Sequence, residues 1–365
     1  MRSKVKLSGV LLSLILIGSV EPVFAQANFY EGKTIRFIVG FSAGGGYDTY
    51  TRLIARHMGK YVPGNPVFVV DNMAGAGSMI SANYTYKVAK PDGLTIGHFI
   101  GGLFLQQLLA KPGIEFDSLK FEYIGVPAQD HFILGVAKST GITDPGKWIT
   151  SKQVVKFGGV ATGSGTDDFP ILLKATISLP IQMVSGYKGT ADVRLAFNSG
   201  EIAGLSNSWE STKSTWKQEL ESGNLIPVLQ TASKPHPELT RVPLAISFAK
   251  TEEARGLIET LARVHGASVR PYVVPPGTPK DRVQILRKAF VDTMKDPALL
   301  AEAKKASLDI NPDDGAELEQ NVKKHLQAGP KPGHQAQGDS QVERLSSKLR
   351  AAAKSHFALL KISSK

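Results

Sequence analysis

The chain has 365 residues, more than a single hydrophobic core usually serves, so we expect two domains. Hydrophobic residues make up 42% and charged residues 21%, which is typical of a globular protein and excludes a disordered or collagen-like chain. The formal net charge is +11, a value that on its own would indicate binding to nucleic acid or to an anionic membrane.

This positive charge is concentrated at the two ends of the chain. Residues 1–25 hold three basic residues and one acid, and residues 321–365 hold nine basic residues and two acids. Residues 26–320 therefore keep a net charge of only +2. A basic face for nucleic acid is not expected on a body so close to neutral.

The N-terminus has the pattern of a signal peptide. Three basic residues precede an apolar stretch from Leu7 to Val20, which is shorter than the ~20 residues that a membrane span needs. Small residues fit cleavage after Ala25 or after Ala27. We therefore predict that residues 1–25 are a signal peptide and that the mature chain is a soluble periplasmic protein.

Cysteine is absent, and the eight histidines are scattered without a metal-binding spacing such as His-Glu-x-x-His. The lack of cysteine excludes disulfides, a lipid-anchoring cysteine, thiolate catalysis and cysteine zinc sites. We expect no metal and no cofactor.

Strands and helices are predicted to alternate at the start of the mature chain. Runs of β-branched and aromatic residues predict strands, and apolar residues at helical spacing predict helices. The strands are expected over 34–39, 67–70 and 94–99, and the helices over 48–61 and 79–89. Such alternation indicates an α/β fold with a mostly parallel sheet.

A second strand-loop-helix set follows near residue 154. Further strands are predicted over 121–126, 131–137, 154–158, 183–185 and 225–230, and further helices over 168–177, 191–197, 252–265 and 280–295. A proline-rich connector separates the last two helices. We assign residues 28–126 and 232–320 to lobe 1 and residues 127–231 to lobe 2.

Residues 321–365 form a basic tail. Its part from Ala328 to Ser340 is rich in glycine, proline and glutamine, as linkers are. Beyond residue 342 the spacing fits a basic amphipathic helix. The sequence leaves open whether this helix contacts lipid or a partner, or only faces solvent.

Four glycine-containing loops each follow a predicted strand and precede a predicted helix, at 42–46, 74–78, 162–166 and 187–190. In open α/β sheets this position borders the ligand crevice. The first turn of a helix offers unpaired backbone N–H groups and a partial positive charge, so these loops are suited to an anion such as a carboxylate. Asp48, Asp167 and Asp168 are expected to cap helices.

Two alternatives, a nucleotide-binding protein and an enzyme, can be compared with known sequence motifs. No phosphate-binding Gly-x-Gly-x-x-Gly or Gly-x-x-x-x-Gly-Lys motif stands in these loops. Gly40-Phe41-Ser42-Ala43-Gly44 matches the Gly-x-Ser-x-Gly elbow of α/β hydrolases, so a secreted hydrolase that uses Ser42 is an alternative. Here, however, the elbow would follow the first predicted strand of the mature chain, which is an unusual position for it.

Several motifs resemble one family. Ile35 to Asp48, Val69 to Ser78, Pro91-Asp92-Gly93-Leu94-Thr95, Gly163-Ser164-Gly165-Thr166, Tyr187-Lys188-Gly189-Thr190 and Pro275 to Pro279 are similar, in order and spacing, to the substrate-binding proteins of tripartite tricarboxylate transporters, the Bug receptors. The resemblance covers about residues 30–315. One difference is Ser42, where the family usually has proline.

The resemblance implies a two-lobed periplasmic binding protein, a Venus flytrap, in which each lobe is a mostly parallel sheet flanked by helices. It implies a monomeric receptor, not an enzyme, that captures a small organic carboxylate for a membrane permease. A sensor of the same ligand class is an alternative. By analogy the ligand-binding residues are Ser42, Ala43, Gly44, Gly45, Asp48, Gly75, Ala76, Gly77 and Ser78 in lobe 1, and Thr162, Gly163, Ser164, Gly165, Thr166, Tyr187, Lys188 and Gly189 in lobe 2.

Overall fold

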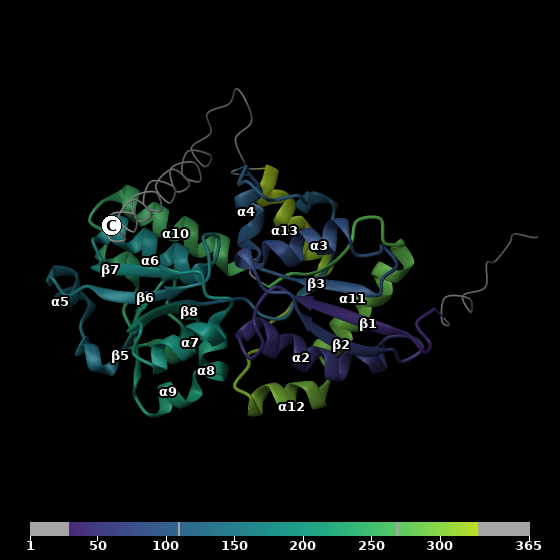
Figure 1. Ribbon diagram of the computed structural model, residues 1–365, viewed down its shortest axis with the longest axis horizontal. Helices are drawn as coiled ribbons and strands as arrows, with labels where there is room; N and C mark the ends of the chain where they lie inside the picture. Colours follow the sequence, from purple (N-terminus) through teal and green to yellow (C-terminus); the bar gives the residue numbers. More distant parts are fainter. Residues whose placement is uncertain (1–28, 109, 268–269, 328–365) are drawn as a thin grey trace, which may run out of the picture.

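The computed structural model describes residues 29–108, 110–267 and 270–327, which form two α/β lobes side by side (Figure 1). The predicted signal peptide and the tail beyond residue 327 lie outside the described residues. Within the described ranges, no helix combines the length and the hydrophobicity that a bilayer crossing would require.

The first lobe is built on a six-stranded sheet with the strand order β11-β4-β10-β3-β1-β2. Strand β1 pairs in parallel with β2 and β3, whereas β10 runs antiparallel between β3 and β4, and β11 is antiparallel to β4. The strands are β1 (Thr34–Val39), β2 (Val67–Asn72), β3 (Thr95–His98), β4 (Glu122–Val126), β10 (Tyr272–Val274) and β11 (Asp313–Asp314).

Helices cover both faces of this sheet. The helices are α2 (Gly46–Met58), α3 (Met79–Lys87), α4 (Gly102–Leu108), α11 (Lys280–Met294), α12 (Pro297–Lys305) and α13 (Gly315–Gln327). Tyr272 and Val274 pack in one core with α2, α11 and α12, while Val273 packs in another with α3, α4 and α13. This follows from the alternation of side chains along a strand.

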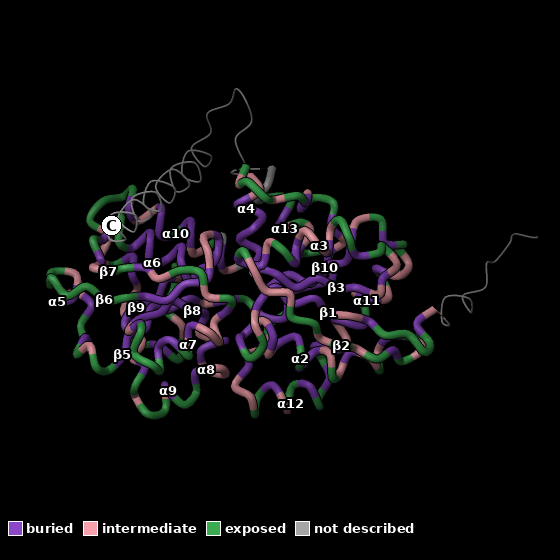
Figure 2. Tube along the Cα trace, in the orientation of Figure 1, coloured by how far each residue is buried: buried purple, intermediate pink, exposed green. Residues whose placement is uncertain are grey.

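The second lobe holds a five-stranded sheet with the order β7-β6-β8-β5-β9. Strand β6 pairs in parallel with β7 and β8, and β5 is antiparallel to both β8 and β9. The strands are β5 (Phe132–Ala137), β6 (Val155–Gly159), β7 (Ile181–Ser185), β8 (Gly204–Ser208) and β9 (Leu225–Gln230). Both sheets are thus mixed: four of the six strands run in one direction in the first sheet, and four of the five in the second. The central strands of both sheets are buried in the middle of their lobes (Figure 2), whereas the edge strand β2 is largely exposed.

The helices of the second lobe are α5 (Pro145–Thr150), α6 (Gly165–Ile177), α7 (Thr190–Asn198), α8 (Trp209–Thr215), α9 (Lys217–Glu221) and α10 (Glu252–Ala267). Leu257, Ile258 and Leu261 of α10 pack in the core of this lobe, together with Ala245 and Ile246. The sequence-based division placed residues 232–267 with the first lobe instead. Residues 245–267 belong with the second lobe by their packing, because the apolar face of α10 is buried against α6. The chain therefore crosses between the lobes near residues 127–131 and again before β10.

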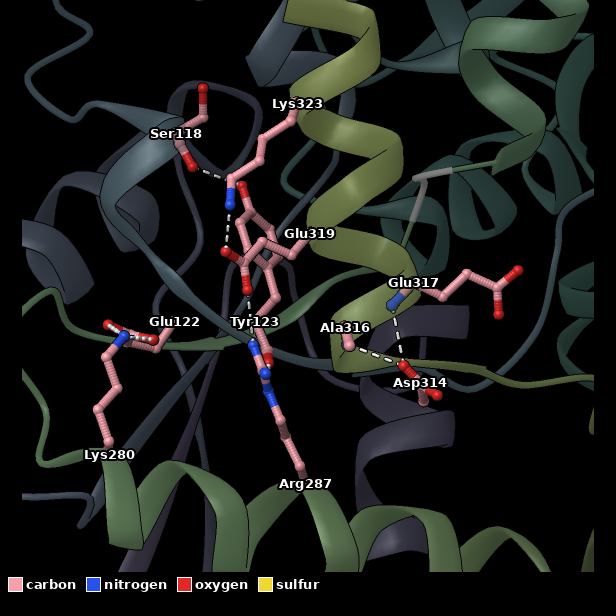
Figure 3. A network of polar contacts seen from close by, with 10 residues as sticks. All are labelled: Ser118, Glu122, Tyr123, Lys280, Arg287, Asp314, Ala316, Glu317, Glu319 and Lys323. Atoms are coloured by element: carbon pink, nitrogen blue, oxygen red, sulfur yellow. Dashed lines mark hydrogen bonds and ion pairs between the residues drawn. The ribbon is translucent and has the colours of Figure 1, made fainter.

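Helix α13 docks on the first lobe beyond the predicted boundary at residue 320. Arg287 of α11 donates a 2.9 Å hydrogen bond to Glu319, and Lys323 donates a 2.6 Å bond to the same carboxylate (Figure 3). Leu318 and Val322 are buried against the sheet. The helix continues to Gln327, so the folded body ends later than the sequence predicted.

Candidate functional site

A pocket lies between the two lobes, with walls from each. From the first lobe it is lined by Phe41, Gly45, Gly46, Tyr47, Ile100 and Gly102. The second lobe contributes Gly163, Ser164, Gly165, Thr166 and Thr190, with Phe132, Val160, Asn207, Ser208, Ser211 and His265. Asp130 and Arg270, from the two segments that cross between the lobes, complete it.

Three helices begin at this pocket. Gly45 is the N-cap of α2 and Gly189 the N-cap of α7, and neither offers a side-chain cap to the helix. Ser164 caps α6 by accepting a hydrogen bond from the N–H of Thr166. Backbone N–H groups of the first turns of α2 and α7 are therefore not satisfied by side-chain caps, and the helix dipoles add positive potential. An anion between the lobes would be attracted by helices of both.

The lobes are closed against each other. The backbone N–H of Ser42 donates a 3.2 Å hydrogen bond to the carbonyl of Lys188, and the Ser42 hydroxyl donates a 2.6 Å bond to Asp192. Lys111 of the first lobe donates a 3.0 Å bond to the carbonyl of Thr162. One hydrophobic cluster contains residues of both lobes.

In this closed state the cavity volume is about 30 Å³. That is room for two or three water molecules at roughly 10–15 Å³ each. A carboxylate of several heavy atoms therefore requires the lobes to part slightly before they close around it.

The glycine loops predicted as binding residues are only partly gathered around the pocket. Gly45, Gly163, Ser164, Gly165 and Thr166 line it. Ser42, Ala43, Gly44, Asp48, Thr162, Tyr187, Lys188 and Gly189 lie outside its lining, although several bridge the lobes beside it.

The loop from Gly75 to Ser78 also lies outside the lining. The Ser78 hydroxyl accepts a hydrogen bond from the N–H of Ile100, so it supports the neighbouring loop. A Cβ atom on Gly77 would lie 2.7 Å from the Cβ of Ala161 in the second lobe. This loop therefore packs against the opposite lobe.

Asp48 is engaged within its own lobe. Its carboxylate accepts hydrogen bonds from the N–H of Gly44 at 2.8 Å, from Arg52 at 2.9 Å and from Asn72 at 2.9 Å. Burial acts to raise the pKa of Asp48, but these three bonds together lower it. These bonds occupy the carboxylate within its own lobe and hold the Gly44 loop before α2, but they do not cap the N–H groups of the helix itself.

The two acids of α6 are also satisfied locally. Asp168 accepts a 3.0 Å bond from the N–H of Gly163 and lies 3.1 Å from Nε2 of His265. Asp167 accepts hydrogen bonds from Thr166 and Ser185, and burial raises its pKa to about 6. Asp168 thereby fixes the Gly163 loop at the edge of the pocket.

This site contains a buried arginine, Arg270, that was not predicted from the sequence. Arg270 donates a 2.8 Å hydrogen bond from Nε to Oδ1 of Asp130, and both side chains are almost completely buried. The hydroxyls of Ser208 and Ser211 accept further bonds from its Nη2. Arg270 lies in an irregular connector before Pro271, where no periodic pattern indicates a binding residue, so the only local signal is a lone arginine beside a proline.

A group of metal-ligand types occurs elsewhere in the described part of the chain. Ligand atoms of Glu210, His236 and Asp309 lie within 4.8 Å of one another. The ammonium of Lys213 pairs with Asp309 at 2.7 Å and with Glu238 at 2.8 Å. A side-chain cation therefore already pairs with one carboxylate of this group.

No protein-family model matches the chain. In sequence it is similar to the UPF0065 protein of the gbd 5′ region of Cupriavidus necator, at 25% identity over 80% of this chain and 84% of that protein. It is also similar to a UPF0065 protein of Agrobacterium vitis, at 28% identity over 55% of this chain and 59% of that protein.

Among solved structures, the periplasmic binding protein BugD superposes with a TM-score of 0.68 at 19% identity, over 89% of this chain and 99% of that one. MatC of Rhodopseudomonas palustris with bound malate gives 0.65 at 19% identity, over 85% and 99%. An R. palustris protein with adipate gives 0.65 at 21% identity, over 87% and 97%. These likenesses confirm the predicted two-lobed fold and the predicted resemblance.

Proposed function

On the premise that the chain resembles the Bug-type periplasmic binding proteins in sequence and in fold, we propose that it is an extracytoplasmic receptor for a small carboxylate. The observation that carries the proposal is the pocket between the lobes, where helix N-termini from both lobes meet a buried arginine. The malate and adipate of the two R. palustris structures are small carboxylates of this kind.

The geometry supports a closure mechanism. In an open form, each lobe offers a carboxylate only part of the donors it needs, and burying an unpaired charge is costly. When the lobes close, backbone N–H groups at the start of α2 and α7 and the guanidinium of Arg270 surround the anion together. Ligand therefore stabilises the closed form, which is the form a partner could recognise.

The remaining features of the proposal follow from the resemblance and the N-terminal sequence. We propose that residues 1–25 direct export to the periplasm and are removed near Ala25 or Ala27. The receptor acts as a monomer without a cofactor and delivers its ligand to the membrane permease of a tripartite tricarboxylate-type transporter. A signalling partner in place of the permease would use the same site.

The hydrolase alternative has less support. In the described part of the chain the Ser42 hydroxyl donates to a carboxylate, Asp192, and is not paired with a histidine base. A serine nucleophile needs a base that takes its proton and an oxyanion site beside it. The bond to Asp192 instead ties one lobe to the other.

A thermal-shift panel of carboxylates on the mature protein tests the proposal. The panel includes malate, succinate, adipate, citrate, aspartate and benzoate, with the corresponding neutral amides as controls. A ligand at 100 times its dissociation constant stabilises the folded protein by about 2.7 kcal/mol, which raises the melting temperature measurably. A panel in which no carboxylate stabilises the protein more than its amide would contradict the proposed function.

A further inference from the structure

The ion pair of Arg270 and Asp130 occupies an unusual place in the molecule. Asp130 lies in the segment that leads from the first lobe into β5, and Arg270 in the segment that returns to β10. The pair therefore joins the two crossing segments at the pocket. The guanidinium also lies over the rings of Tyr47 and Tyr50, with Cζ 4.8 Å and 4.9 Å from the ring centroids.

Two atoms of this pair have no hydrogen-bond partner among the described residues. They are Nη1 of Arg270 and Oδ2 of Asp130, on side chains that are 2% and 1% exposed. Buried polar atoms are almost always paired, and an unpaired one destabilises the folded protein, more strongly when it is charged. A free donor and a free acceptor in the lining of one pocket therefore point to a ligand that completes both.

The pair of Asp168 and His265, beside the pocket, differs from the pair of Arg270 and Asp130. Asp168 uses one carboxylate oxygen for the N–H of Gly163 and the other for His265. Both oxygens of Asp168 therefore have partners within the protein. The pair of Arg270 and Asp130, in contrast, keeps one atom of each partner for another molecule.

The charges at and beside the pocket indicate which chemical groups that molecule carries. Burial and the nearby Asp130 raise the pKa of Glu210 to about 8, so near neutral pH Glu210 holds a proton. Burial raises the pKa of Asp130 as well, while the charge of Arg270 acts to lower it. Arg270 and Asp130 then neutralise each other. A carboxylate alone would pair with Arg270 but would leave the Asp130 oxygen unsatisfied and facing another anion.

We propose that the ligand carries, on the same small skeleton as its carboxylate, a hydrogen-bond donor that Asp130 accepts while Arg270 binds the carboxylate. The donor is a hydroxyl or an ammonium group, so the ligand is a hydroxy acid or an amino acid. Arg270 and Asp130 thereby determine which carboxylates the receptor accepts. This inference rests on the proposed function, and it names the substrate class of that same pocket.

Calorimetric titration of the mature wild-type protein with matched ligands tests the inference. One series is succinate, malate and aspartate, and a shorter one is propionate, lactate and alanine, so that only the donor group changes within a series. A hydrogen bond to a charged group is worth about 1.5–3 kcal/mol, so the hydroxy or amino member should bind at least about tenfold more tightly than the unsubstituted acid. If malate binds most tightly, the donor that Asp130 accepts is a hydroxyl; if aspartate binds most tightly, it is an ammonium group.

The variant Asp130→Asn shows whether Asp130 carries that preference. The amide keeps the shape of the side chain but removes its charge, so the preference for the donor-bearing acid should fall to within about threefold. Glu319→Gln, which removes the charge of an ion pair with Arg287 outside the pocket, is the matched control and should leave the preference unchanged. Where Asp130→Asn does not fold, the wild-type series decides by itself.

The outcomes separate the two proposals. Unsubstituted acids that bind as tightly as their hydroxy and amino counterparts overturn this inference and leave the carboxylate receptor intact. A preference that survives Asp130→Asn also overturns this inference. The ion pair would then serve only to hold the two crossing segments together. Failure of every acid in both series to bind overturns the proposed function and this inference together.

Discussion

Ser42 of the first lobe donates a 2.6 Å hydrogen bond to Asp192 of the second lobe, across 150 positions of sequence. Asp192 lies in the first turn of α7, just after Gly189. In the loop before this helix, the carbonyl of Lys188 accepts a hydrogen bond from the backbone N–H of Ser42. The two bonds exist only when the lobes are closed, so they stabilise the closed form over the open one.

Ser42→Ala should therefore weaken ligand binding without abolishing it. Loss of one hydrogen bond to a charged group costs about 1.5–3 kcal/mol at most, and solvent access at this half-buried bond reduces the effect to roughly three- to tenfold in affinity. Calorimetry with the best carboxylate measures it. Ser247→Ala, whose hydroxyl bonds within its own turn, is the control. Turnover of an activated ester by the wild type, lost in Ser42→Ala, would instead support the hydrolase alternative.

Gly102→Ala should block closure while each lobe still folds. A Cβ atom on Gly102, in the first lobe, would overlap the backbone carbonyl oxygen of Gly163 in the second lobe. Backbone cannot turn aside as a flexible side chain can, so the closed form is excluded and affinity should fall by more than about tenfold. Small-angle scattering should show a larger radius of gyration than for the wild type with ligand.

Gly266→Ala is the matched control for Gly102→Ala, because its added Cβ has its nearest neighbour at 3.9 Å. This variant should close and bind as the wild type does. If Gly102→Ala binds with unchanged affinity, ligand binding does not require the closed arrangement described here.

The pH dependence of stability tests the assignment of the proton to Glu210. Its pKa is raised from the ordinary value of 4.5 to about 8, chiefly by burial. Between these two values the unfolded chain has lost the proton and the folded chain keeps it, so the free energy of unfolding falls as the pH rises from about 4.5 to 8, by up to about 1.4 kcal/mol per pH unit.

Glu210→Gln removes this titration while an amide oxygen can still accept the N–H of His131. Urea unfolding at pH 5, 6.5 and 8 should give a shallower loss of stability for Glu210→Gln than for the wild type. Glu221→Gln, at an exposed position of α9, should retain the wild-type slope. Equal slopes for wild type and Glu210→Gln would show that Glu210 is ionised in the folded protein.

Much of the fold could be predicted because local pattern and burial agree along the chain. The run from Thr34 to Val39 forms β1 as expected, and the helices expected at 168–177 and 280–295 form as α6 and α11 within a few residues. Strand β8 was missed because Gly-Leu-Ser-Asn-Ser has no β-branched or alternating pattern, and it is buried on both sides only through its position between β6 and β5.

The site could be predicted only where it consists of backbone. The Gly163 loop and Gly45 line the pocket because glycines after strands mark the ends of a parallel sheet, and that signal is local. Arg270 and Asp130 lie 140 positions apart in irregular segments, and they meet only because the chain crosses between the lobes twice. A contact of this kind depends on the tertiary fold and leaves no local pattern in the sequence.

Isothermal titration calorimetry of the mature wild-type protein with the tightest carboxylate of the panel shows directly whether the chain is a carboxylate receptor. We expect one ligand per chain with a dissociation constant in the micromolar range or below, which is about −8 kcal/mol at 1 μM. Gly45→Val should abolish that binding, because an added Cβ atom at Gly45 would lie 2.9 Å from the Thr190 hydroxyl and the valine side chain would fill the pocket at the start of α2. No heat with any carboxylate, or undiminished binding by Gly45→Val, would contradict a carboxylate receptor that closes on its ligand at this pocket.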